Sequence, residues 1–124
     1  MGSVGVYEAE WALSKVLPRS DVDPNQNRLM LAQQMVWGGP IPRLFPELEL
    51  VDDDSVQNAV VILIDANAGV EKVATVRYVD VMSAYRISGR GWWEFARDSG
   101  ILEGDRIDLY VGRRGNDEPC LLFF

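Results

Sequence analysis

The sequence predicts a mainly β fold, a small barrel or sandwich of about seven short strands with one or two short helices. Apolar segments rich in β-branched residues recur along its 124 residues, and clusters of Gly, Pro, Asn and Asp separate them at short intervals. Only one stretch, near residue 95, has a clear helical period. Periodicity does not choose between a barrel and a sandwich, since both protect strand edges. The length fits one domain with a single core.

The first third of the chain predicts two strands joined by a polar loop. Residues 10–17 (EWALSKVL) alternate loosely and end at Pro18, and residues 28–31 (RLML) resume the apolar pattern. Residues 32–37 predict one helical turn, and the Gly and Pro residues of 38–46 (GGPIPRLFP) predict a connection without regular structure. The loop between the strands is either a solvated turn or an arm that contacts another molecule.

The middle of the chain predicts an acidic loop and a hairpin. Residues 47–55 (ELELVDDDS) contain adjacent carboxylates that repel one another, which is typical of a solvated loop, and they lack the spacing of a calcium site. Residues 56–65 (VQNAVVILID) form a β-branched run, and residues 67–69 supply a turn. Residues 70–79 (VEKVATVRYV) return as the second strand of the hairpin.

The last third predicts three strands and the one well-marked helix. Residues 84–88 (AYRIS) form a short strand, and a helix runs from Trp92 to a stop at Gly100. Two further strands follow, with Gly, Asn and Asp residues of 112–117 around the turn between them.

The tryptophans and the single cysteine are expected to pack in the fold. Trp92 lies on the apolar face of the helix and is assigned to the core, and Trp11 and Trp37 are also expected to pack. Trp93 is compatible with core and surface alike. Cys120, inside the apolar run CLLFF, has no second cysteine to pair with and is expected to pack as a small hydrophobe.

The composition argues against catalysis and metal binding. The chain contains no His, which removes the usual general base and the commonest zinc ligand. No Ser lies in a nucleophile-elbow pattern. We therefore expect no enzymatic activity, no catalytic residues, no metal site and no cofactor. The net charge of −7 argues against nucleic-acid binding over the whole surface but leaves room for a local basic face.

The termini and hydropathy bear on compartment and domain limits. No apolar run approaches the roughly 20 residues of a membrane helix, and the N-terminal MGSVGVYEAE lacks the regions of a signal peptide. We therefore expect an intracellular protein with no membrane partner. Residues 1–9 are expected to be a flexible segment, whose Met-Gly-Ser start resembles a remnant of cloning, and residues 10–124 the folded domain.

Seven short motifs follow one another in a fixed order along most of the chain. The first are Lys15, Ser20-Asp21-Val22 and Asn27-Arg28-Leu29, and downstream come Arg77-Tyr78, Tyr85-Arg86-Ile87, Gly91-Trp92 and Gly104-Asp105. A Gly-Asp step alone is weak because many tight turns contain it, but the early motifs combined with Gly-Trp are specific as a set. From about Trp11 to the C-terminus, the chain resembles the plant-specific B3 DNA-binding domain, most of all in small proteins with a single such domain.

The resemblance implies a fold, a partner and a compartment. The fold is a seven-stranded open β-barrel, the B3-type pseudobarrel, with short helices at its ends, formed by residues 10–124. The partner is double-stranded DNA, read at a short site in the major groove by a plant transcriptional regulator in the nucleus. Two arms carry the contacts in that family, and they correspond to the loop within residues 14–31 and to residues 79–84 (VDVMSA).

Side-chain chemistry and the resemblance together give the candidate site. The Arg, Asn and Gln side chains of the first arm can pair with base edges. Lys15 and Arg28 are expected to reach phosphates, whereas Ser20 and Asp21 are suited to holding the backbone of their own loop. The candidate DNA-binding residues are Lys15, Arg19, Ser20, Asn25, Gln26, Asn27, Arg28, Arg77 and Ser83.

The second arm is less well equipped than the first. It offers Asp80, which phosphates repel, and Ser83 as its only other polar side chain. DNA binding by this chain therefore needs a local basic mouth with the acids elsewhere. We expect that mouth to be formed by Lys15, Arg19, Arg28, Arg43 and Arg77.

The acidity and the poor second arm also support an alternative. In this alternative the fold binds DNA weakly or not at all and serves as a protein-interaction or dimerisation module. It predicts an exposed apolar patch, either around Ile41, Leu44 and Phe45 or at the C-terminal LLFF, and a homodimer or a complex with a protein partner.

Overall fold

The computed structural model describes residues 6–36, 38–46, 48, 58–115 and 117–124. The described residues form seven strands: β1 (Val6–Val16), β2 (Arg28–Ala32), β3 (Ala59–Asp65), β4 (Glu71–Val79), β5 (Ala84–Ser88), β6 (Arg106–Arg114) and β7 (Glu118–Phe123). The helices connecting them are α1 (Arg19–Val22), α2 (Gln33–Val36), α3 (Pro40–Leu44), the 3₁₀ turn η2 (Asp80–Met82) and α4 (Arg90–Ser99).

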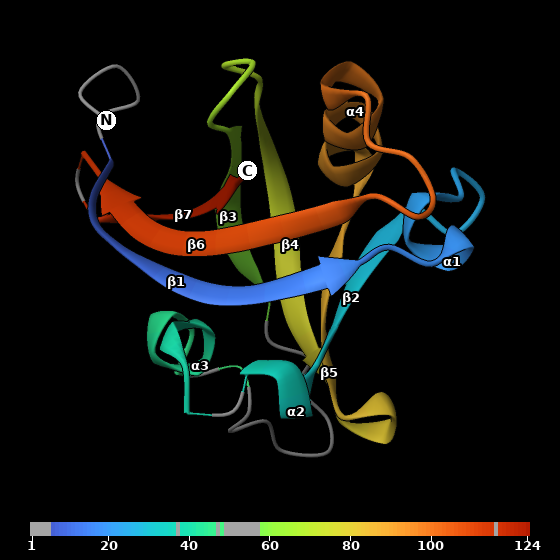
Figure 1. The fold of residues 1–124 in the computed structure, drawn as a ribbon. Helices are drawn as coiled ribbons and strands as arrows, with labels where there is room; N and C mark the ends of the chain where they lie inside the picture. Colours follow the sequence, from blue (N-terminus) through green and yellow to red (C-terminus); the bar gives the residue numbers. More distant parts are fainter. Residues whose placement is uncertain (1–5, 37, 47, 49–57, 116) are drawn as a thin grey trace.

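One curled sheet contains all seven strands, in the order β1-β6-β7-β3-β4-β5-β2. Neighbouring strands run antiparallel except β3 and β7, which are parallel. The sheet forms an open barrel in which β1 and β2 are the edge strands (Figure 1). The inward-facing side chains of each strand form the buried core. The predicted seven-stranded open barrel with short helices is therefore confirmed.

Helix α4 lies at one end of the barrel (Figure 1). Two of its aromatic side chains are part of the buried core. Trp92 and Phe95 are buried there, and the ring centroids of Phe95 and Phe123 lie 4.7 Å apart. Gly91 lets the helix approach β4, because a Cβ at this position would lie 1.9 Å from the carbonyl oxygen of Val73. The core position predicted for Trp92 is confirmed.

Some element boundaries differ from those predicted. The helix ends at Gly100, as expected, and this residue has the left-handed φ of 70° that favours glycine. It begins at Arg90, however, rather than at Trp92. The first strand begins at Val6 rather than at residue 10, and the loop that follows it contains α1.

The GGPIPRLFP segment contains a helix where the sequence predicted none. Helix α3 begins at Pro40 and includes Pro42. The first N–H groups of a helix have no partner within it, so prolines in the first turn cost no hydrogen bond. The apolar patch predicted around Ile41, Leu44 and Phe45 is also wrong, because Ile41 and Phe45 are buried and Leu44 packs against the core.

Trp11 is 55% exposed, so its predicted packing role is wrong. The register between β1 and β6 shifts between Trp11 and Leu13, which marks a β-bulge. The extra residue brings both Ala12 and Leu13 into the core. Trp11 is left on the outer face of the sheet, beside Tyr110 of β6. Regular alternation does not anticipate two consecutive buried residues here.

Cys120, the acidic run, membrane helices and metal sites are the remaining subjects of the sequence predictions. Cys120 is buried in a small apolar cluster, as expected. The acidic run at residues 52–54 and the packing of Trp37 lie outside the described residues. None of the described helices is long and apolar enough to cross a membrane. Across the described parts of the chain, no group of three or more His, Cys, Asp or Glu side chains is arranged to hold a metal ion.

Candidate nucleic-acid interface

The loop between β1 and β2 is built around one buried carboxylate, Asp21, which is 1% exposed. Its Oδ1 accepts hydrogen bonds from Arg28 Nη1 at 3.1 Å and from the backbone N–H of Met30 at 3.2 Å. Its Oδ2 lies 2.5 Å from Lys15 Nζ in an ion pair. The indole N–H of Trp92 donates to the Asp21 carbonyl oxygen at 2.9 Å. Asp21 therefore joins its loop to β1, β2 and α4. The sequence predicts that its side chain bonds the backbone of the loop itself, whereas the carboxylate bonds residues of the flanking strands.

Lys15 and Arg28 are committed to this carboxylate. Lys15 Nζ also donates to the carbonyl oxygen of Met30 at 2.5 Å, which links the edge strands β1 and β2 across the barrel opening. Two cations share one carboxylate, so the cluster keeps one positive charge. Their side chains are 15% and 16% exposed, which leaves a small part of each at the surface. The cluster is thus a fixed, locally positive anchor for the first arm.

The tip of the first arm presents amide side chains to solvent. Asn25 and Gln26 are exposed, and the backbone N–H of Asn25 donates to Asp23 Oδ1 at 2.9 Å. Gln26 Oε1 accepts a hydrogen bond from Arg28 Nη2 at 2.9 Å, which leaves the amide N–H groups of this exposed side chain without a partner among the described residues. Asn27 differs: its φ is 48° and its Oδ1 is buried without a partner among the described residues. Asn27 therefore shapes the turn, a role that asparagine tolerates.

The start of α1 carries the other two candidates of the first arm. Arg19 is exposed and makes no hydrogen bond or ion pair with any described residue. Ser20 is half-buried beside Asp21. Arg19 is therefore a free cation at the first arm, whereas Ser20 lies at its base.

The second arm is the turn between β4 and β5, formed by η2 and the residue after it. Ser83 has a left-handed φ of 47° and its backbone N–H donates to the Asp80 carbonyl oxygen at 3.0 Å. Val81 and Met82 are 95% and 59% exposed. The arm is as poor in donors as the sequence predicted, and its tip is apolar.

The two arms lie at opposite ends of the β2–β5 pair (Figure 1). Arg28, where the first arm ends, pairs with Ser88, and Ala32 pairs with Ala84, where the second arm ends. At about 3.3 Å per residue, the length of β2 separates them by about 13 Å. This spacing is close to the width of the DNA major groove, about 12 Å.

Two arginines face each other on the strands between the arms. Arg77 of β4 pairs in register with Arg86 of β5, and Met30 of β2 lies next in the same row. The alternating residues Tyr85 and Ile87 are buried in the core, so Arg86 points to the opposite face. Its Nε is buried without a hydrogen-bond partner among the described residues. Arg86 therefore carries a charge that no described residue pairs, on the outer face of the sheet.

The other cations of the chain show how uneven the charge distribution is. All Lys and Arg residues fall within the described ranges. The pairs away from the arms are Arg43 with Glu10, Lys72 and Arg97 with Asp98, Arg106 with Asp108, and Arg114 with Glu71, and Arg113 bonds the carbonyl of Asp117. Those without a hydrogen bond or ion pair to any described residue are Arg19, Arg77, Arg86 and Arg90. We call these four, with the Lys15–Asp21–Arg28 cluster, the basic face.

The residues of the basic face differ in part from those of the basic mouth that the sequence predicted. Arg43 does not belong to it, because it lies on α3 and pairs with Glu10 at 2.6 Å. Acids are not entirely elsewhere either, since Asp23 and Asp80 lie on the two arms. Arg86 and Arg90 belong to it but were not among the candidates. The alternation of AYRIS was a signal for Arg86, whereas nothing in the sequence distinguished Arg90.

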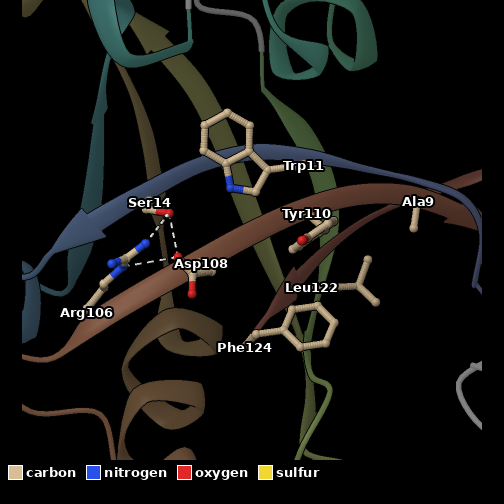
Figure 2. A pocket seen from close by; sticks show the side chains of 8 residues that line it. All are labelled: Ala9, Trp11, Ser14, Arg106, Asp108, Tyr110, Leu122 and Phe124. Carbon is tan, nitrogen blue, oxygen red and sulfur yellow. Dashed lines mark hydrogen bonds and ion pairs between the residues drawn. The ribbon is translucent and has the colours of Figure 1, made fainter.

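A groove lies on the outer face of β1, β6 and β7 (Figure 2). It has a volume of about 670 Å³, and aromatic side chains of Trp11, Tyr110 and Phe124 line it. At one end Ser14 donates a hydrogen bond to Asp108, which also pairs with Arg106. These two contacts hold the pKa of Asp108 below its ordinary value. The remaining lining residues are Ala9 and Leu122. None of the four unpaired arginines lines this groove.

The comparisons with known proteins agree with this architecture. No family model matches the chain, and no curated protein does. Among solved structures, the chain is similar to Arabidopsis FUS3 in complex with DNA, with a TM-score of 0.59 and 16% identity, over 92% of this chain and 96% of that one. At this identity the likeness concerns the fold. The chain therefore has the fold of the B3 domain that its sequence motifs resemble.

Proposed function

We propose that this chain is a double-stranded DNA-binding module whose two arms contact the major groove. The distribution of cations carries the proposal. In a chain of net charge −7, the arginines without a partner among the described residues all lie on or beside the arms and the strands between them. Protein–DNA affinity rests largely on such cations, because each one that neutralises a phosphate releases counterions.

The basic face supplies two kinds of contact in this proposal. Arg19, Arg77, Arg86 and Arg90 bind phosphates and set the position of the duplex. Asn25 and Gln26 read base edges, for which amide side chains are suited, with a discrimination of about 1 to 3 kcal/mol for each bidentate pair. The Lys15–Asp21–Arg28 cluster keeps the first arm in a fixed position, and this reduces the ordering cost of binding.

The fold and the motifs together support a biological role. FUS3, to which the chain is structurally similar, was solved in complex with DNA. We propose that this chain likewise acts in the nucleus as part of a plant transcriptional regulator, without catalytic activity of its own.

Selection from a randomised duplex pool at two salt concentrations tests the proposal. We expect one short motif to be enriched, and the enrichment to weaken as salt rises. The double variant Asn25→Ala/Gln26→Ala should still bind but select a relaxed motif. Gln34→Ala is the matched control, because Gln34 is an exposed amide on α2, outside both arms. Enrichment of no motif at either salt concentration contradicts the proposal.

The protein-binding alternative has one structural feature in its favour, the groove beside Trp11. Of the C-terminal LLFF, only Phe124 is exposed, and it lines this groove. We favour DNA binding because the unpaired cations, which a protein-docking groove leaves unexplained, lie elsewhere. Light scattering distinguishes the two: a monomer that binds a selected duplex excludes the dimerisation module.

A further inference from the structure

The tip of the second arm exposes apolar side chains at a position of unusual prominence. Val81 is 95% exposed, more than any other large apolar residue of the described chain, and the adjacent Met82 is 59% exposed. Single exposed apolar residues are common on protein surfaces. Two adjacent ones at the tip of a turn that flanks the basic face need a further explanation.

The turn that carries them is held in place at both ends. The Ser83 N–H bonds the Asp80 carbonyl oxygen at 3.0 Å, and the Gln33 N–H bonds the Ser83 carbonyl oxygen at 2.8 Å. The second bond ties the turn to the end of β2. Val81 and Met82 therefore project from a defined backbone.

The chemistry of the turn limits what it can read. It contains no Arg, Lys, Asn or Gln, so it lacks the bidentate donors that recognise guanine or adenine. Methyl and thioether groups contact the C5-methyl group of a pyrimidine, the one apolar feature of the major-groove edge. Asp80, beside them, accepts a hydrogen bond from the N4 amino group of cytosine. Both features belong to pyrimidines.

We propose that Val81 and Met82 read the C5-methyl group of a pyrimidine at the base-pair step under the second arm. This inference rests on the proposed DNA binding and deepens it. The methyl group has two sources in duplex DNA, thymine and 5-methylcytosine. The first arm then reads by hydrogen bonds and the second by apolar contact, which explains how a turn with so few donors contributes to recognition.

Base analogues that change one methyl group test the inference. In the selected duplex, each thymine is replaced in turn by deoxyuridine, which removes the methyl group and keeps the pairing. Each cytosine is replaced in turn by 5-methylcytosine, which adds one. We expect one position at which loss of the methyl group weakens wild-type binding about fourfold, or its gain strengthens binding by a similar factor.

Two substitutions that remove the apolar ends of the side chains assign the effect to the arm. In Val81→Ser/Met82→Gln, which leaves no methyl group at either position, the affinity ratio between methylated and unmethylated duplexes at that position should fall to about one. Val73→Ser is the matched control, because Val73 is 62% exposed on β4 and lies outside the turn. This control should keep the wild-type ratio.

The outcomes separate the inference from the proposed function. A selected motif whose affinity is insensitive to C5-methyl groups at every position overturns the inference and leaves DNA binding intact. A methyl effect that persists unchanged in the double variant also overturns it, since another residue then makes the contact. Failure to select any motif overturns the proposed function, and the inference with it.

Discussion

At the scale of single residues, Asp21 accounts for the composition of the first arm. Two of the polar side chains of residues 14–31, Lys15 and Arg28, satisfy one buried carboxylate, together with the backbone N–H of Met30. The sequence suggested that Asp21 holds its own loop, since short polar side chains do so in turns. It did not show that Lys15 and Arg28 are its partners, because their meeting depends on how β1 and β2 approach across the barrel opening.

Asp21→Asn should lower the free energy of unfolding by about 3 kcal/mol, measured by denaturant titration. The substitution keeps the oxygen that accepts from Met30 but leaves Lys15 and Arg28 adjacent without their counter-ion. Asp80→Asn, at an exposed carboxylate with no side-chain hydrogen bond or ion pair among the described residues, should change stability by about 0.5 kcal/mol or less. Equal effects of the two substitutions contradict the account of Asp21.

Cys120 should behave as an inert core thiol. Burial raises the pKa of its thiol above the ordinary value, so the reactive thiolate is scarce at neutral and mildly alkaline pH. Because it is the only cysteine, reaction with an aromatic disulfide reagent reports on it alone. At pH 8 we expect slow reaction in buffer and fast reaction in denaturant. Fast reaction of the folded protein contradicts its burial.

At the scale of elements, the sequence predicted most of the strands but missed several local features, of which α3 and the bulge in β1 are the clearest. Hydrophobic alternation and turn residues located the strands from β2 onward to within a few residues. Helix α3 was not predicted, because a proline in the first turn of a helix looks the same in sequence as a proline that breaks one. The β-bulge in β1 was not predicted, because one extra residue leaves no compositional signal. This bulge is the reason why Trp11 is exposed.

Gly91→Ala should separate α4 from β4. The new Cβ lies 1.9 Å from Val73 O and 2.7 Å from Val73 C, both rigid backbone atoms, so the helix must move and its aromatic packing suffers. We expect a loss of about 3 kcal/mol in stability by thermal or chemical denaturation. Gly39→Ala is the control, since its φ of −93° is ordinary and its nearest contact is 3.3 Å. A neutral Gly91→Ala contradicts the packing described here.

At the scale of the whole molecule, an acidic chain and a basic face are compatible because net charge is an average. The paired cations lie mostly away from the arms. Of the unpaired ones, Arg77 and Arg86 are neighbours on β4 and β5, Arg19 lies on α1 in the first arm, and Arg90 begins α4 directly after β5. The sequence named the first-arm candidates and Arg77. It could not find Arg86 as the partner of Arg77, because their adjacency depends on the register of β4 with β5.

The groove at Trp11 should not take part in DNA binding. Trp11 lies on the outer face of β1 and is not part of either arm. Trp11→Ser should therefore leave the affinity for a selected duplex within about twofold, as measured by fluorescence anisotropy. A tenfold loss with an unchanged fold would place the duplex against the outer face of β1, β6 and β7 rather than against the basic face.

The salt dependence of duplex affinity tests the role of the basic face most directly. In Arg77→Gln/Arg86→Gln, we expect the log–log salt slope to become shallower by about 1.8, since each phosphate contact contributes about 0.9. Arg43→Gln/Arg97→Gln removes the same two charges from exposed, already paired positions and should leave the slope at its wild-type value. Equal slopes for the two double variants would contradict the account, because overall charge rather than the basic face would then govern binding.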